Sequence, residues 1–407
     1  MDYISHTLPN GLRLVHYPSD SPVAYCGFAI NAGTRDELPG EHGLAHFVEH
    51  MLFKGTEKRR AWHILNRMET VGGELNAFTT KEETFVYSVF LEEHFKRAFE
   101  LQADLILHSK FPLRELEKET DVIKDEINAY KDSPSELIFD DFENQLFSNH
   151  SLGHNILGDE DSLEKFSADA GLGFMRRFYT ARNMVFFSMG RVKFDNIVRW
   201  AEILMEESPQ HEVELNRQPP EPLAPSVVRS KKETHQSHVI IGSRSYSMFN
   251  DKRMPLFLLN NIIGGPGMNS RLNVVLREKN GLVYTVESNV TSYTDTGVAS
   301  IYFGTDPKNK QKVIRLIERE LDAFCQHLLP QKTLDSAKKQ LKGQLGISTD
   351  NRESLFLALG KSFLHYNEYD SLPETFELID AISSEDIRTV ACEVYGDSVR
   401  NRLEYDG

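Results

Sequence analysis

The sequence has few cysteines and no long apolar run. Only three of its 407 residues are cysteine. Cys26, Cys325 and Cys392 are far apart and have no CxxC spacing, which argues against a disulfide framework and a thiolate metal site. The stretch MDYISHTLPNGLRL lacks a basic start followed by an apolar segment, so we expect no signal peptide. No apolar stretch is long enough to span a bilayer. We therefore expect a cytoplasmic protein that does not bind membranes.

An excess of positive charge is also missing. The formal net charge is −15, which argues against a nucleic-acid partner. Hydrophobic residues make up 40% and charged residues 26% of the chain, as in ordinary globular proteins. A chain of 407 residues is too long for one hydrophobic core, so two domains are expected.

The same order of elements occurs twice along the chain. Strand, helix, paired strands and further helices are predicted before residue 209 and again after residue 226. Between them, residues 209–226 (PQHEVELNRQPPEPLAPS) are polar, acidic and rich in proline, which is typical of a linker. We predict an α+β fold of two homologous halves, 1–208 and 227–407, each a mostly antiparallel sheet with helices packed on it, together forming a clamshell.

The stretch HGLAHFVEHMLFKGT (42–56) contains two histidines four residues apart. On a helix such residues lie on one face, so His46 and His50 could share a metal ion. Two neutral imidazoles suit zinc, and a catalytic zinc site needs a third protein ligand and an open position for water. Glu49 lies on the same side and could take a proton from that water. The alternative is a surface helix that contains histidines by chance.

A third ligand is expected on another helix. Residues 111–134 (FPLRELEKETDVIKDEINAYKDSP) carry an apolar stripe at helical spacing. Glu126 flanks this stripe, and Glu119 lies two turns earlier on the same side. The two acids also fit a solvated helix edge, and the spacing alone leaves both interpretations open.

Five segments together resemble one family. TLPNGLRLV, NAGTRDE, GLAHFVEHMLFKGT, GGELNAFTTKEETFVY and VIKDEINAYKDSP are similar to the pitrilysin/insulinase zinc peptidases, most closely their mitochondrial-processing-peptidase-like branch. That family has the inverted motif HxxEH, with a glutamate ligand some 75 residues later. The resemblance implies one zinc ion on His46, His50 and Glu126, with Glu49 as general base. It also implies that Glu119 orients a histidine ligand or holds a proton.

The second half has no HxxEH motif. Its segment GGPGMNSRLNVVLREKNGLVYTVES (264–288) resembles the glycine-rich loop and Arg/Tyr pair of the family. The resemblance implies that Tyr284 donates to the scissile carbonyl oxygen and that Arg277 binds substrate backbone carbonyls. By themselves, these residues also fit a surface arginine and a tyrosine that starts a strand. The loop matches neither a P-loop nor GxGxxG, so nucleotide binding is not expected.

These features predict a zinc metalloendopeptidase that cleaves unfolded peptides or extended segments inside a chamber. A peptide substrate would add as a strand at Asn76, Ala77, Phe78 and Thr79, although an ordinary hairpin strand fits the same residues. One alternative is a non-catalytic assembly or core-type subunit. Another is a peptidase that is active only with a partner subunit. Relatives of this size are commonly dimers, so a homodimer also fits.

Overall fold

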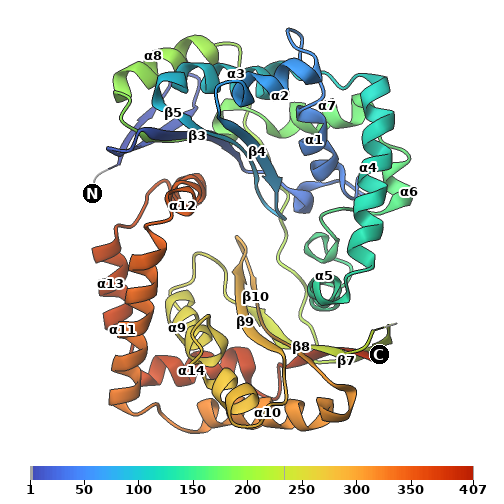
Figure 1. Ribbon diagram of the computed structural model, residues 1–407, viewed down its shortest axis with the longest axis vertical. Coiled ribbons are helices and arrows are strands. Elements are labelled where there is room, and N and C mark those ends of the chain that lie inside the picture. Colours follow the sequence, from blue (N-terminus) through green and yellow to red (C-terminus); the bar gives the residue numbers. More distant parts are fainter. Residues whose placement is uncertain (1–2, 233, 407) are drawn as a thin grey trace. The chain divides into compact units, whose positions relative to one another are not determined.

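The computed structural model describes residues 3–232 and 234–406, and these form two compact units. Unit 1 contains the chain up to residue 128 together with 154–217 and 348–370. Unit 2 contains 129–153, 218–347 and the chain from 371 onward. Each unit is one sheet with helices packed on it (Figure 1), as the sequence predicts.

Unit 1 contains a sheet of six strands in the order β1-β2-β6-β3-β5-β4. Only the pair β2 and β6 is parallel. Strand β4 lies at one edge, where β5 is its sheet neighbour. The strands are β1 (Ile4–Thr7), β2 (Arg13–Pro18), β3 (Val23–Ile30), β4 (Glu74–Thr79), β5 (Thr84–Leu91) and β6 (Met184–Gly190).

Both faces of this sheet are apolar, because every residue of β6 is buried and its side chains alternate between the faces. One face packs against helices of unit 1 that include α1, α3 and α7. The helices of unit 1 are α1 (Leu44–Leu52), α2 (Ala61–Glu69), α3 (Phe95–His108), most of α4 (Leu113–Lys131), α6 (Glu160–Leu163), α7 (Ala168–Phe178), α8 (Phe194–Leu204) and α12 (Arg352–Tyr366).

Unit 2 repeats this topology with five strands in the order β7-β11-β8-β10-β9. Taken in chain order, β7 to β11 occupy the same places as β2 to β6, and again only the first and last of them pair in parallel. The predicted duplication is therefore present. The strands are β7 (Val227–Lys231), β8 (Ser237–Ser245), β9 (Thr285–Ser292), β10 (Gly297–Thr305) and β11 (Asn401–Asp406).

The helices of unit 2 include one irregular element. A regular helix is predicted over 270–281, but residues Asn273–Glu278 form a π-helix, η5.

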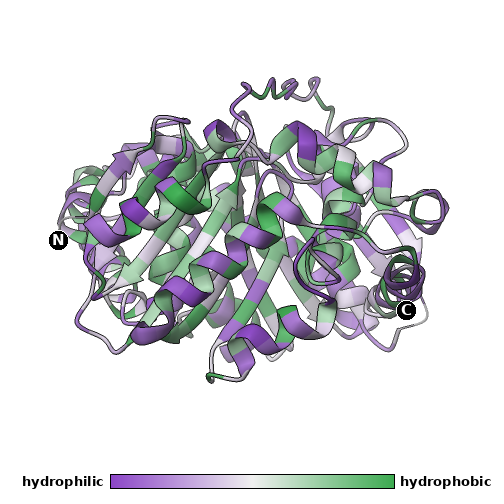
Figure 2. Cartoon of the chain, turned by 90° about the horizontal axis from the view of Figure 1, so that it is seen from above, coloured by the Kyte–Doolittle hydropathy of each residue, from purple (hydrophilic) through white to green (hydrophobic). Residues whose placement is uncertain are grey.

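Figure 2 shows that many helices carry both hydrophilic and hydrophobic residues, as expected for elements that cover a sheet. The other helices of unit 2 are α5 (Pro134–Leu146), α9 (Arg253–Gly264), α10 (Lys310–Gln326), α11 (Gln331–Ser348), α13 (Leu372–Ala381) and α14 (Ser384–Tyr395).

Each unit takes one helix from the other half of the sequence. Helix α12 covers the second face of the unit 1 sheet, where Phe356 and Phe363 pack among strand residues such as Phe187. Helix α5 packs on the sheet of unit 2 through residues such as Phe142. The predicted halves are continuous in sequence, whereas the compact units are not. Residues 209–226, the predicted linker, contain neither helix nor strand.

Among the described residues, no helix combines the length and the apolar character that a membrane crossing requires.

Candidate metal centre

The helix that carries the histidines begins at a tight turn. Gly43, its N-cap, has φ 90°, a left-handed conformation that favours glycine. The carboxylate of Glu37 accepts hydrogen bonds from the backbone N–H groups of Gly43 at 3.0 Å and Ala45 at 2.8 Å. Burial raises the pKa of Glu37, and these two hydrogen bonds oppose the rise. Glu37 therefore satisfies N–H groups that a helix start leaves without partners.

Three predicted ligands converge between α1 and α4. Nε2 of His50 lies 3.5 Å and Nε2 of His46 lies 3.8 Å from Oε2 of Glu126. One ligand atom from each of the three side chains lies within 4.8 Å of the other two. Ligands bound 2.0–2.2 Å from a tetrahedral zinc ion are roughly 3.3–3.5 Å apart. The three side chains therefore fit a single zinc ion after a small inward adjustment.

Glu119 orients one of the histidines. Its Oε2 lies 3.0 Å from Nδ1 of His50, and its Oε1 lies 2.5 Å from Nζ of Lys54. With Nδ1 engaged in this way, Nε2 of His50 is left facing Glu126. In metal-binding histidines, the ring nitrogen that faces away from the metal commonly forms a hydrogen bond with a carboxylate.

Burial keeps the His46 imidazole in the neutral form that can bind a metal ion. Burial, with a smaller contribution from His50, lowers the pKa of His46 to about 3. Its imidazole is therefore neutral at physiological pH and keeps a lone pair for a ligand bond. The donor set of two imidazoles and one carboxylate is one that zinc uses in catalytic sites.

Glu49 lies beside the last residue of β4. Burial raises the pKa of its carboxyl group; Thr79 and His50 oppose this rise, and Glu126 adds to it. Helix α1 packs against β4, and Thr79 lies near the Glu49 carboxylate, although its buried hydroxyl has no hydrogen-bond partner among the described residues. A carboxyl group with a raised pKa beside a metal site is suited to act as a general base and then as a general acid.

The predicted substrate residues, 76–79, lie in β4 and therefore at the sheet edge. Asn76 is paired in register with Tyr87 of β5, and Thr79 also reaches Glu49. The position of this strand agrees with the prediction of an edge. That a peptide binds there remains a prediction.

Arg277 and Tyr284 lie in unit 2, whereas the three predicted ligands lie in unit 1. Arg277 is exposed in η5, which ends at a turn where Gly281 has φ 57°. Tyr284 directly precedes β9, is 61% exposed, and its hydroxyl lies 3.4 Å from Oδ1 of Asp306. Their catalytic roles remain predictions.

Comparison with known proteins supports the resemblance. Residues 14–160 match the family model described as insulinase, peptidase family M16, and residues 165–341 match the one described as peptidase M16 inactive domain. A protein of Bacillus subtilis named uncharacterized zinc protease YmxG is 33% identical over 392 residues, which cover 96% of this chain and 95% of the relative. The chain belongs to peptidase family M16. Nothing in these matches separates the mitochondrial-processing-peptidase-like branch from the rest of the family.

Two solved structures share the fold of this M16 chain. The structure described as the peptidase M16 inactive domain from Pseudomonas fluorescens superposes with a TM-score of 0.93 at 18% identity, covering 100% of this chain and 98% of the other. A protease from Helicobacter pylori gives a TM-score of 0.90 at 20% identity, with 100% of both chains covered. At such identities the likeness concerns the fold alone.

Two side-chain contacts near the metal cluster were not predicted from the sequence. Lys54, four residues after His50, pairs with Glu119, and its spacing could have suggested this. Thr79 was assigned only to the substrate edge, yet it also contacts Glu49. No local pattern indicates that second contact, because it joins a helix to a strand 30 residues later in the chain.

Proposed function

We propose that this M16 chain is a zinc metalloendopeptidase that cleaves unfolded peptides or extended segments. The observation that carries this proposal is the convergence of His46, His50 and Glu126, with one ligand atom of each within 4.8 Å of the other two. Relatives named zinc proteases match nearly the whole chain, which supports the same conclusion.

The residues of unit 1 divide the chemistry among them. His46, His50 and Glu126 would hold the ion, and Glu119 fixes the orientation of His50. A bound zinc ion would supply Lewis acidity, which polarises a scissile carbonyl and acidifies water. Glu49 would accept a proton as water attacks and deliver it to the leaving amine. Thr79 lies beside the Glu49 carboxylate at the end of the edge strand.

The edge strand would align the substrate. Strand β4 is paired with β5 along one side, and an extended peptide could add along the other, with its backbone hydrogen-bonded to β4. Recognition through backbone groups places little demand on side chains and excludes segments that are folded. In unit 2, Tyr284 would donate to the developing oxyanion, and Arg277 would bind substrate carbonyls.

The experiment uses the purified chain alone, a mixture of random peptides, and mass spectrometry to map the cuts, with and without a zinc chelator. We expect cleavage that the chelator abolishes and added zinc restores. Glu49→Gln should retain zinc and lose about 10²–10⁴-fold in kcat, because a general base contributes about that much. Glu57→Gln is the control, since Glu57 is exposed and pairs only loosely with Lys110, at 3.7 Å.

Other outcomes separate the alternatives. Bound zinc without cleavage by the chain alone, followed by cleavage after a second subunit is added, would identify a partner-dependent peptidase. Absence of both zinc and cleavage would favour a non-catalytic assembly subunit. If Glu49→Gln kept most of the activity, Glu49 would not be the base.

A further inference from the structure

Helix α12 contributes charged side chains to unit 1 close to the strand that carries Thr79. The reaction outlined above makes no use of them. Nε2 of His365 lies 2.7 Å from Oε1 of Glu83, and Nζ of Lys361 lies 3.0 Å from the same oxygen. The side chains of His365 and Glu83 are each only 3% exposed. Burial would raise the pKa of Glu83, but His365 and Lys361 lower it to about 2, so the carboxylate is charged at neutral pH.

Glu83 in turn closes the loop between β4 and β5. Its Oε2 accepts a hydrogen bond from Oγ1 of Thr80 at 2.5 Å, and that hydroxyl accepts one from the backbone N–H of Glu83 at 2.9 Å. The backbone N–H of Thr80 donates to the carbonyl oxygen of Glu83 at 2.8 Å. The position of Thr80 is therefore determined by the residue that α12 contacts.

Thr80 directly follows Thr79, the residue beside Glu49. An edge strand is paired on one side only, and its last residue is prone to fray unless another group holds it. A buried hydrogen bond to a charged carboxylate is stronger than one between neutral groups. The contact of α12 with Glu83 is therefore strong enough to hold the end of β4 in one place.

We propose that α12 is a positioning element of the peptidase site, in which His365 and Lys361 act through Glu83 and Thr80 to keep Thr79 against Glu49. This proposal rests on the peptidase function inferred above. Among the described hydrogen bonds and ion pairs, none joins these four residues to His46, His50 or Glu126, so we assign them a positioning role and no part in the reaction. The helix that completes the active half comes from the last quarter of the sequence.

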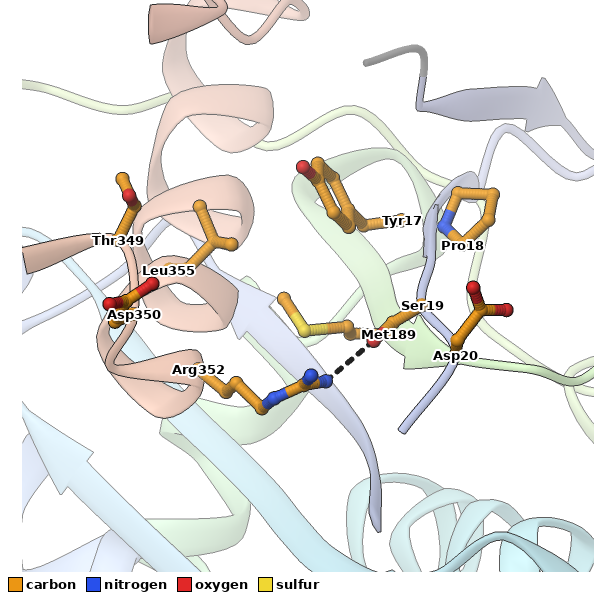
Figure 3. Close-up of a pocket in the computed structure, with 9 residues that line it drawn as sticks. All are labelled: Tyr17, Pro18, Ser19, Asp20, Met189, Thr349, Asp350, Arg352 and Leu355. Carbon is orange, nitrogen blue, oxygen red and sulfur yellow. Dashed lines mark hydrogen bonds between the residues drawn. The ribbon is translucent and has the colours of Figure 1, made fainter. Parts of the chain in front are cut away.

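The test compares His365→Ala with His365→Gln in the full-length, zinc-loaded protein. Nε2 of glutamine can replace Nε2 of histidine as the donor to Glu83, whereas alanine removes the donor. Arg352→Ala is the matched control on the same helix. Arg352 is its first residue and donates to Oγ of Ser19 at 2.6 Å, in a pocket of about 490 Å³ that none of the four positioning residues lines (Figure 3).

We expect His365→Ala to lower kcat about tenfold, with KM and bound zinc little changed, because small displacements of a catalytic group are costly. His365→Gln should recover most of that loss, and Arg352→Ala should match the wild type. Thr80→Val should lower kcat to a similar extent. The double variant His365→Ala/Thr80→Val should have about the same kcat as either single variant, because both substitutions interrupt the same series of contacts through Glu83.

Hydrogen exchange without substrate gives a second readout. Peptides covering residues 74–83 should exchange faster in His365→Ala than in the wild type, and those covering α1 should not. Unchanged kcat in His365→Ala, or additive losses in the double variant, would overturn the proposal. If the wild type itself cleaves no peptide, the proposed peptidase function is wrong. Hydrogen exchange then tests separately whether α12 holds the end of β4. Equal exchange in the wild type and His365→Ala would show that it does not.

Discussion

One hydrogen bond decides which nitrogen of His50 can bind a metal ion. Nδ1 lies 3.0 Å from Oε2 of Glu119, so Nε2 is the nitrogen that faces Glu126. Without Glu119 the His50 ring could rotate, and Lys54 would lose the carboxylate with which it forms an ion pair. We expect Glu119→Ala to weaken zinc binding about 10- to 100-fold, the usual effect of removing such a partner. Competition with a coloured chelator measures this affinity.

Glu115→Ala is the matched control for this prediction. Glu115 lies one turn earlier on α4, and its one ion pair among the described residues is with Lys118, at 3.0 Å. The two variants change the same residue type on the same helix, so a difference between them reports the contact with His50. Equal zinc affinity in both variants would mean that Glu119 does not orient this ligand.

At the scale of elements, the sequence predicts the metal helix better than it predicts what covers the sheet. HxxEH and its helical spacing place His46 and His50 on one face, and the apolar stripe of 111–134 places Glu126 at its flank, because both are local patterns. Glu126 remains partly exposed, with 45% of its side chain accessible. The buried strand residues of β6 indicate only that both faces need cover. Which helix supplies that cover depends on contacts between distant segments, and neither α5 nor α12 carries a local signal for its partner.

Helix α12 lies closer to β6 than a side chain at residue 360 would allow. A Cβ on Gly360 would come within 2.7 Å of the Phe187 ring, which is fully buried and cannot easily move. Gly360→Ala gains about 1 kcal/mol of helix propensity. It should lose about 1–3 kcal/mol through overpacking. We expect a lower melting temperature for unit 1, measured by calorimetry.

The control for that substitution is Gly343→Ala on α11. Gly343 is exposed, and a Cβ there would meet nothing within 4 Å. The gain in helix propensity should therefore appear alone, as stabilisation of up to about 1 kcal/mol. If Gly360→Ala stabilised the protein as much as Gly343→Ala does, close packing of α12 on β6 would not contribute to its docking.

At the scale of the whole molecule, the duplicated topology can be predicted from the order of the elements. Strands and helices follow one another in the same order before and after residues 209–226. The short strands β1, β7 and β11 were not predicted, and β1 and β7 are mostly exposed. Strands of four to six residues with little apolar content give a weak periodic signal, and their neighbours in the sheet define them. The π-helix η5 was predicted as a regular helix, since its sequence is amphipathic in either form.

The two units share a topology but carry different side chains, and this difference allows a test of unit 2. Unit 1 holds the three predicted metal ligands. In unit 2, Tyr284 has a mostly exposed ring, and its hydroxyl makes a long contact, 3.4 Å, with Asp306. A phenol with so weak a partner is free to donate to a substrate oxyanion. We expect Tyr284→Phe to lower kcat by about 10²–10³ and to leave zinc content and melting temperature unchanged. Tyr246→Phe is the control, since that hydroxyl is engaged with Glu393 at 2.5 Å. Equal kcat for both variants would assign the oxyanion donor to another residue and would leave unit 2 without a demonstrated chemical role.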